Sequence, residues 1–297
     1  AACLLTATGA THAFTFETDN LRGSFDSTVT IGTGIRTKDP SCTLIIQGAV
    51  GVGAPAGCLA PTSSMGDQGN LNYRKGDAFT TYIKGSHELL LKMPDDITFL
   101  GRVNWVRDLT ATRTSGYTSA AATQYLPDGL ASDARSDLRF KARLLDFWVS
   151  KTFQLGGETA RVRVGNQVIS WGESLFLPGG INATNALDIM RLSQPGTQLK
   201  EAVLPAPIAS FATGLGHGLN FEAYVQSRWN GNYMPPTGSY WSVANGMGKG
   251  HDAYGLIQTK PKNGGQWGTA LKWQPDGTQL NLGAYVMNYN DKALNFS

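Results

Sequence analysis

The sequence predicts an all-β protein, an antiparallel transmembrane β-barrel, of which the chain holds about nine N-terminal strands of a larger barrel. Three observations predict this fold. Apolar and polar residues alternate along extended stretches, short and long connections alternate along the chain, and one face of the expected strands carries too much charge for a packed core.

The composition agrees with such a barrel and excludes several other classes. The 297 residues carry a net charge of +3, which is too small to indicate a nucleic-acid partner. A mean hydropathy of −0.19 excludes a bundle of several membrane helices. Strands of alternating polarity average out on a hydropathy scale, so a membrane β-barrel agrees with this value.

The N-terminus resembles the end of a secretory signal peptide. Residues 1–13 are small and mostly apolar and close on Thr11-His12-Ala13, an A-x-A-like cleavage site. The alternative is an ordinary disordered N-terminus. The expected organisation is a signal-peptide remnant over 1–13, followed by the N-terminal part of the barrel over 14–297.

Cleavage there leaves two cysteines, Cys42 and Cys58. In an exported protein we expect them to form a disulfide, which closes a short loop and contributes about 3 kcal/mol in the chain-entropy model. Two free buried thiols are the alternative. The uncharged stretch 40–66 is rich in glycine and proline, so it predicts a loop and not a membrane helix.

The first clear strand covers 24–36, where Phe25, Val29 and Ile31 alternate with polar residues. The turn Pro94-Asp95-Asp96 then joins strands 78–93 and 97–108. Trp105 lies opposite Gly85 in this register, an aromatic side chain that covers a glycine. The other predicted pairs are Leu91–Phe99, Leu89–Gly101 and His87–Val103 on the apolar face and Glu88–Arg102 on the polar face.

Three further hairpins turn at Gly156-Gly157, near 214–218 and at Asp276-Gly277. They join, in order, strands 138–154 and 159–169, 204–213 and 219–230, and 266–274 and 279–290. The predicted pairs are Val149–Val164 and Phe147–Asn166 in the first, Phe211–Phe221 in the second, and Trp273–Leu280, Leu271–Leu282 and Trp267–Val286 in the third.

The connections alternate in length, since the short turns are separated by long segments at 37–77, 109–137, 170–203 and 231–265. Short turns at one end and long loops at the other are typical of a transmembrane β-barrel. An odd count of about nine strands leaves such a barrel unfinished, so we expect more strands in the natural protein. The side chains expected to line its water-filled interior are Arg102, Arg143, Asp146, Arg161, Arg163, Gln167, Glu222 and Arg228.

The segment 170–203 mixes polar anchors with many apolar residues, which is unusual for a solvated loop tip. We expect it to fold back into the barrel and narrow the interior. The alternative is an ordered external cap that does not enter. The residues expected at the constriction are Trp171, Glu173, Asn185, Asp188 and Arg191.

Motifs for catalysis are weak. Residues 172–176 (GESLF) resemble a nucleophile elbow but lack its final glycine and its strand-to-helix context. His87, His217 and His251 share no metal-ligand spacing, and 67–72 fits a turn better than a calcium loop. We therefore expect no catalytic residue, no metal, no cofactor and no enzymatic activity.

Residues 165–174 read GNQVISWGES, which resembles the signature G-[RN]-Q-[VI]-[VI]-S-W-G-E-S of a family of Gram-negative outer-membrane proteins of unknown function. The likeness runs over nearly all of 14–290. The supporting stretches are 66–73 (GDQGNLNY), 75–77 (KGD), 180–182 (GIN), 194–196 (QPG), 200–202 (KEA), and Trp229 with 236–240 (PTGSY). Members of that family are larger than this chain and are often encoded beside a lipoprotein-like family and RND-type exporters.

The resemblance implies a channel or export component in the outer membrane of a Gram-negative bacterium, for hydrophobic or amphipathic small molecules. Its implied partners are outer-membrane lipid, the hydrophobic solute, a periplasmic lipoprotein and an RND-type exporter. Two alternatives stay open. A soluble exported all-β binding protein would fold without detergent, and an outer-membrane hydrolase would be labelled at Ser174 by a hydrolase probe.

Overall fold

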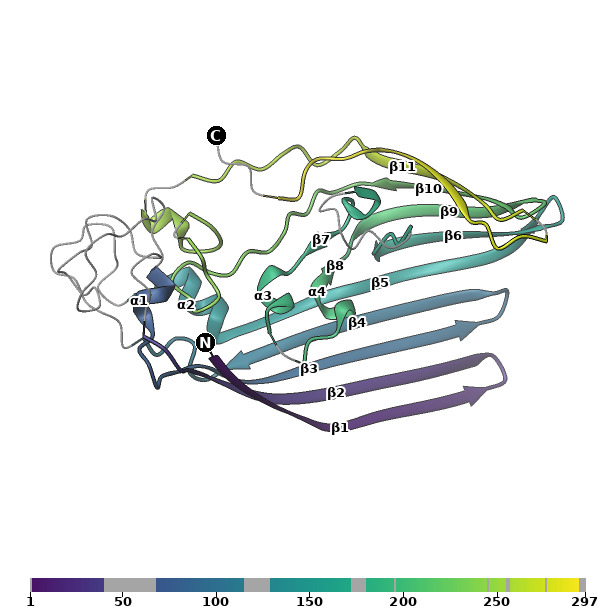
Figure 1. Ribbon diagram of the computed structural model, residues 1–297. Helices are drawn as coiled ribbons and strands as arrows, with labels where there is room; N and C mark the ends of the chain where they lie inside the picture. The colour runs from purple at the N-terminus through teal and green to yellow at the C-terminus, as the bar shows by residue number, and fades with distance from the viewer. Residues whose placement is uncertain are drawn as a thin grey trace.

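The computed structural model consists mainly of one antiparallel sheet. Within the described residues the sheet has ten strands in the order β1-β2-β3-β4-β5-β6-β9-β10-β11-β12 (Figure 1). This confirms the antiparallel all-β class; the sheet is open, with β1 and β12 at its edges. The described residues are 2–39, 68–114, 129–171, 180–194, 196–244, 246–254, 257–275 and 277–293.

The strands follow the alternating stretches of the sequence. Those of the large sheet are β1 (Ala2–Thr18), β2 (Leu21–Arg36), β3 (Ala78–Met93), β4 (Ile97–Asp108), β5 (Phe140–Leu155), β6 (Glu158–Gln167), β9 (Ala206–Gly216), β10 (Leu219–Gln226), β11 (Gln266–Trp273) and β12 (Leu282–Asn288). The shorter elements are α1 (Gln68–Asn72), α2 (Ser132–Arg139), η2 (Gly180–Asn182), β7 (Ala186–Leu187), α3 (Ile189–Leu192), α4 (Leu199–Ala202), β8 (Val203–Leu204) and η3 (His251–Tyr254).

Short and long connections lie at opposite ends of the sheet, as the sequence predicts (Figure 1). The turn at Gly156-Gly157 shows why it can be short. Both glycines have positive φ angles, 62° and 87°, which a two-residue turn of type I′ requires. The predicted registers of β3–β4 and β5–β6 are confirmed, including Gly85 opposite Trp105 and Val149 opposite Val164.

Two predicted registers are wrong by two residues. The observed pairs are Phe221–Thr213 in place of Phe221–Phe211, and Trp273–Leu282, Leu271–Ala284 and Trp267–Asn288 in place of Trp273–Leu280, Leu271–Leu282 and Trp267–Val286. The turns explain both errors: an irregularity follows Leu219, and the connection of β11 to β12 is longer than the Asp276-Gly277 turn. A shift of two residues keeps each side chain on its predicted face.

The sheet also has one strand more than expected, because β1 includes most of residues 1–13. It pairs with β2 from Thr18↔Leu21 to Ala2↔Arg36, with an irregularity between Thr8 and Thr11. The sequence gives little sign of this strand, since its first residues do not alternate in polarity. Pairing needs only backbone groups, which every non-proline residue carries. Cleavage after Ala13 stays a prediction.

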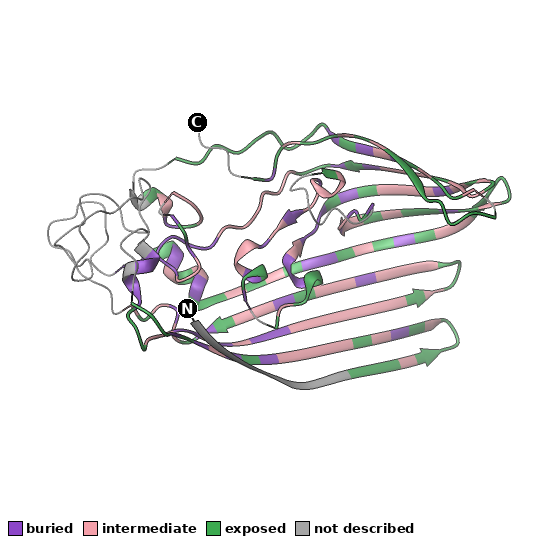
Figure 2. Ribbon diagram, in the orientation of Figure 1, coloured by how far each residue is buried: buried purple, intermediate pink, exposed green. Residues whose placement is uncertain are grey.

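The distribution of apolar and polar side chains over the two faces of the sheet is the inverse of that in a soluble sandwich. On the outer face large apolar side chains are exposed, with Val164 56% and Val225 58% accessible. On the inner face polar side chains are buried, with Lys84 5% and Gln167 1% accessible. Figure 2 shows this change in burial from residue to residue along the strands. No helix in the described residues is long and apolar enough to cross a membrane.

Gly85 offers a direct test of the register. A Cβ atom there would lie 2.4 Å from Nε1 of Trp105, which donates a hydrogen bond to Nε2 of His87. We expect Gly85→Ala to lower the free energy of unfolding by about 1–3 kcal/mol, the usual cost of overpacking, as measured by denaturant titration. Gly264→Ala is the matched control, since nothing lies within 4 Å of its Cβ. Equal effects of the two substitutions would contradict the register.

Candidate functional site

The long connection between β6 and β9 folds back over the inner face of the sheet, where β7, α3, α4 and β8 lie in front of the long strands (Figure 1). We call residues 180–204 the insert. Its contacts reach strands far apart in the sheet: Glu201 to Lys84 of β3, Asp188 to Arg143 of β5, and Thr184 to Tyr224 of β10.

Lys84 and Glu201 hold the insert to β3. Lys84 Nζ lies 2.8 Å from Oε2 of Glu201 and also donates to the carbonyl oxygen of Gly196 at 2.7 Å. Both side chains are 6% accessible. A buried ion pair of this kind contributes little net stability but penalises any arrangement that separates its charges. It therefore fixes where α4 sits on the sheet.

Asp188 is the second anchor. Its carboxylate caps α3 by accepting from the backbone N–H of Arg191 at 2.9 Å, and it accepts from Nη1 of Arg143 at 2.5 Å. The side chain is 1% accessible. Asn185 adds a backbone clamp, since its amide pairs with both the N–H and the carbonyl oxygen of Ile169.

A third cluster joins the insert region to the long-loop end of the sheet: Asp137, Lys141, Tyr233 and Lys249. Tyr233 donates to Asp137, and Lys141 Nζ lies 3.2 Å from the centre of the Tyr233 ring. Burial by itself raises the pKa of Asp137, but Lys141, the Tyr233 hydroxyl and Lys249 outweigh it and lower that pKa. Burial and the Asp137 charge raise the pKa of Tyr233.

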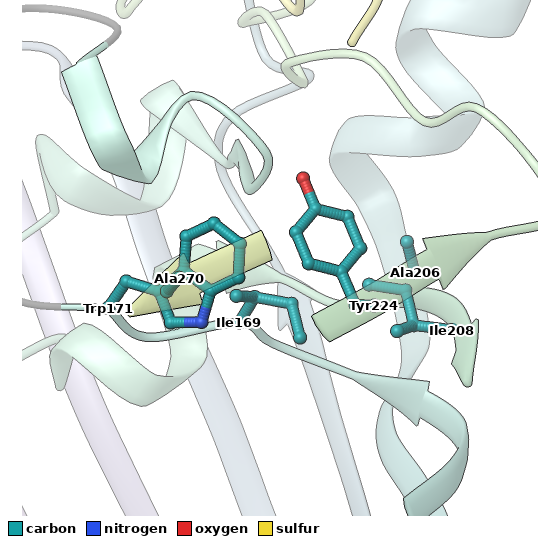
Figure 3. Packing of buried hydrophobic residues seen from close by; sticks show 6 residues of the cluster. All are labelled: Ile169, Trp171, Ala206, Ile208, Tyr224 and Ala270. Atoms are coloured by element: carbon teal, nitrogen blue, oxygen red, sulfur yellow. The ribbon is translucent and has the colours of Figure 1, made fainter. Parts of the chain in front are cut away.

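An apolar cluster lies where β6 ends (Figure 3). Its centre is Trp171, whose ring packs on Tyr224 with centroids 5.1 Å apart. Trp171 Nε1 donates to Oε2 of Glu222 at 2.9 Å, and its carbonyl oxygen accepts from the hydroxyl of Tyr285 at 3.1 Å. The buried members are Ile169, Trp171, Ala206, Ile208, Tyr224 and Ala270.

The structure brings most residues expected to line the interior onto the inner face. Arg102 joins Asp146 and Glu88, with 2.6 Å to each. Gln167 donates to the carbonyl oxygen of Ile208 at 2.8 Å. Arg161 is exposed on this face, and Arg228 differs from the rest because it lies beyond the end of β10.

Arg161, Arg163 and Glu222 line two neighbouring recesses on this face. The smaller, of about 180 Å³, is lined by both arginines, Gln167, Ser210 and Glu222, and by Trp171. The larger, of about 470 Å³, is lined by Arg161, Glu222 and Lys272 among others. Arg161 and Glu222 therefore stand between the two recesses.

Of the residues expected at the constriction, Trp171, Asn185 and Asp188 lie at the junction of the insert with the inner face. Arg191 is buried within the insert, where it donates to Gln194 at 3.2 Å. Glu173, Cys42 and Cys58 lie outside the described residues, so their roles stay predictions. Sequence reasoning missed Lys84, Glu201 and Tyr233. Lys84 stands at an inner position of its alternating strand, but no sequence pattern indicates its partner 117 residues away.

The described residues contain no group of three or more His, Cys, Asp or Glu side chains that could hold a metal ion.

The comparisons with known proteins give a family and no activity. The family model described as "Protein of unknown function (DUF1302)" matches residues 1–297. No curated protein and no solved structure matches the chain.

Asp188→Asn tests the anchor of the insert. The substitution leaves Arg143 without its buried carboxylate, so we expect the free energy of unfolding to fall by about 3 kcal/mol. We also expect faster tryptic cleavage after Arg191 and Lys200. Asp252→Asn is the control, because Asp252 is exposed and should change stability by less than about 0.5 kcal/mol. Resistance of both variants to trypsin would contradict the anchor.

The cluster of Asp137, Lys141, Tyr233 and Lys249 predicts a loss of stability in acid. A carboxyl whose folded pKa is lowered stabilises the fold above its ordinary pKa of about 3.9 and loses that contribution as the pH falls through the folded value. We expect thermal unfolding of the Asp137→Asn variant to depend less on pH than the wild type between about pH 5 and pH 2. An unchanged pH dependence would show that Asp137 does not carry this stability.

Proposed function

The chain belongs to the DUF1302 family of proteins of unknown function, and we propose that it forms a channel in the outer membrane of a Gram-negative bacterium, for hydrophobic or amphipathic small molecules. The observation that carries this proposal is the inversion of the sheet. Apolar side chains are exposed on its outer face, and charged side chains are buried with the insert on its inner face.

The outer face fits lipid better than water. Its exposed apolar side chains lie on strands from β2 to β12, and a soluble monomer rarely exposes apolar side chains over so many neighbouring strands. In a membrane these side chains meet hydrocarbon. They include Phe25, Ile31, Val103, Leu144, Phe147, Val149, Val162, Val164, Val225, Leu271 and Val286.

The strands have the dimensions for this role. β2, β3 and β5 each have 16 residues, whereas a tilted strand needs about 9–11 to cross the hydrocarbon core. The remaining residues extend toward the long loops. Closure of the sheet into a barrel is part of the proposal, because unpaired backbone groups at β1 and β12 are too costly in lipid.

The insert supports a channel with a narrowed interior. It crosses the inner face, and its polar anchors and the apolar cluster around Trp171 would offer a solute both kinds of contact. A periplasmic lipoprotein and an RND-type exporter are the partners that the sequence resemblance suggests. The proposal assigns no catalytic residue.

Two arginine substitutions on one strand test the faces. Leu89→Arg places a charge on the outer face and should weaken folding into lipid vesicles by roughly 2–4 kcal/mol near mid-membrane. Ser86→Arg is the matched control on the inner face, where Ser86 pairs with Thr28 and Asn104. Denaturant titration in vesicles gives the difference. If the protein folds without detergent or lipid, the soluble binding protein is correct and the channel is not.

Deletion of 180–196 in the full-length protein tests the insert. Removing this segment should raise single-channel conductance in planar bilayers, since it removes the chain that crosses the inner face. Heat-modifiable migration on a gel shows whether the deletion variant is folded. A folded variant with unchanged conductance would place the insert outside the conducting path.

A further inference from the structure

Two arginines on β6 stand out on the inner face. Arg161 and Arg163 alternate with the outward Val162 and Val164, so both guanidinium groups face inward. Neither forms an ion pair with any described residue. The Nε atom of Arg163 is buried without a hydrogen-bond partner, while its guanidinium carbon lies 4.0 Å from the centre of the Trp148 ring. A buried donor without an acceptor is costly.

Carboxylates near this pair are already matched. Glu222 lies between Lys272 and Trp171, with its two oxygens 2.8 Å from Nζ and 2.9 Å from Nε1. Arg102 and Lys200 match Glu88 and Asp146 in charge. Within the described residues, neither Arg161 nor Arg163 forms an ion pair, and Asp146, the carboxylate whose charge reaches Arg163, is bound to Arg102 at 2.6 Å.

The recesses give this charge a place to act. The cavity of about 180 Å³ is lined by both arginines, by Glu222 and Trp171, and by Gln167 and Ser210, which hydrogen-bond to each other. Arginine binds carboxylates through two parallel hydrogen bonds. The guanidinium of Arg163 stacks on Trp148, and this contact holds it in one orientation. Trp171 and its apolar neighbours form a wall beside the charged groups.

We propose that Arg161 and Arg163 form a binding site for the carboxylate of an amphipathic organic acid, whose apolar part rests against the wall at Trp171. This inference rests on the proposed function and deepens it, because it gives the solute an anionic head group. The site lies on the inner face next to the insert, so a solute that passes along this face meets it.

Benzoate is a suitable probe because it combines a carboxylate with a small apolar ring. Binding to the full-length protein in detergent is measured by calorimetry, with benzyl alcohol as the uncharged analogue. The double variant Arg161→Gln/Arg163→Gln should bind benzoate at least about tenfold more weakly, since charge-assisted hydrogen bonds are lost. Arg161→Lys/Arg163→Lys, which keeps the charge but not the paired donors, should bind with intermediate affinity.

Arg228→Gln is the matched control, because it removes an arginine that lies beyond β10 and outside both recesses. It should leave benzoate binding unchanged within about twofold, which is below 0.5 kcal/mol. Equal binding by the double variant and the wild type overturns the site. Tighter binding of inorganic phosphate than of benzoate overturns the assignment to carboxylates.

A conductance measurement separates this inference from the proposed function. If the protein forms pores but benzoate binding does not depend on Arg161 and Arg163, the site is wrong and the channel stands. If no pores form but binding depends on both arginines, the channel is wrong and the site stands. If both hold, the double variant should also shift the reversal potential in a salt gradient toward cation selectivity.

Discussion

Each ion pair on the inner face depends on the register in which the strands pair, because side chains alternate between the two faces with a period of two. A slip of β4 by one residue would turn Arg102 outward, which would leave Asp146 without its cation and Glu88 with Lys200 alone. The same slip would bring Trp105 inward, away from Gly85. The register thus sets both the apolar outer face and the charged inner face, and an error in it is costly on both.

The insert uses the inner face that the register creates. Lys84 and Arg143 extend inward from β3 and β5 and bind Glu201 and Asp188. In a dry core such charges would be expensive to bury, and here each one is matched by a carboxylate from the returning segment. These ion pairs therefore determine where the insert lies on the inner face. The insert in turn covers the Trp171 cluster.

The sequence predicted the strands and their faces well because alternation and turn chemistry are local properties. Trp105 over Gly85 and Glu88 opposite Arg102 both follow from the position of one turn. Where the connection was irregular, as between β9 and β10, or longer than predicted, as between β11 and β12, the register differed by two residues and each side chain kept its predicted face. β1 was missed because its first residues do not alternate in polarity, while strand pairing requires only backbone groups.

The sequence by itself determined the class of the fold, the ends of the hairpins and the set of charged residues on one face, since each depends on neighbours within a few residues. Only the tertiary structure decided which charges are matched. Glu201 meets Lys84 because 180–204 crosses strands far away in the chain, whereas Arg161 and Arg163 form no ion pair with a described residue. Periodicity carries no information on such long-range contacts, because many partners satisfy the same local pattern.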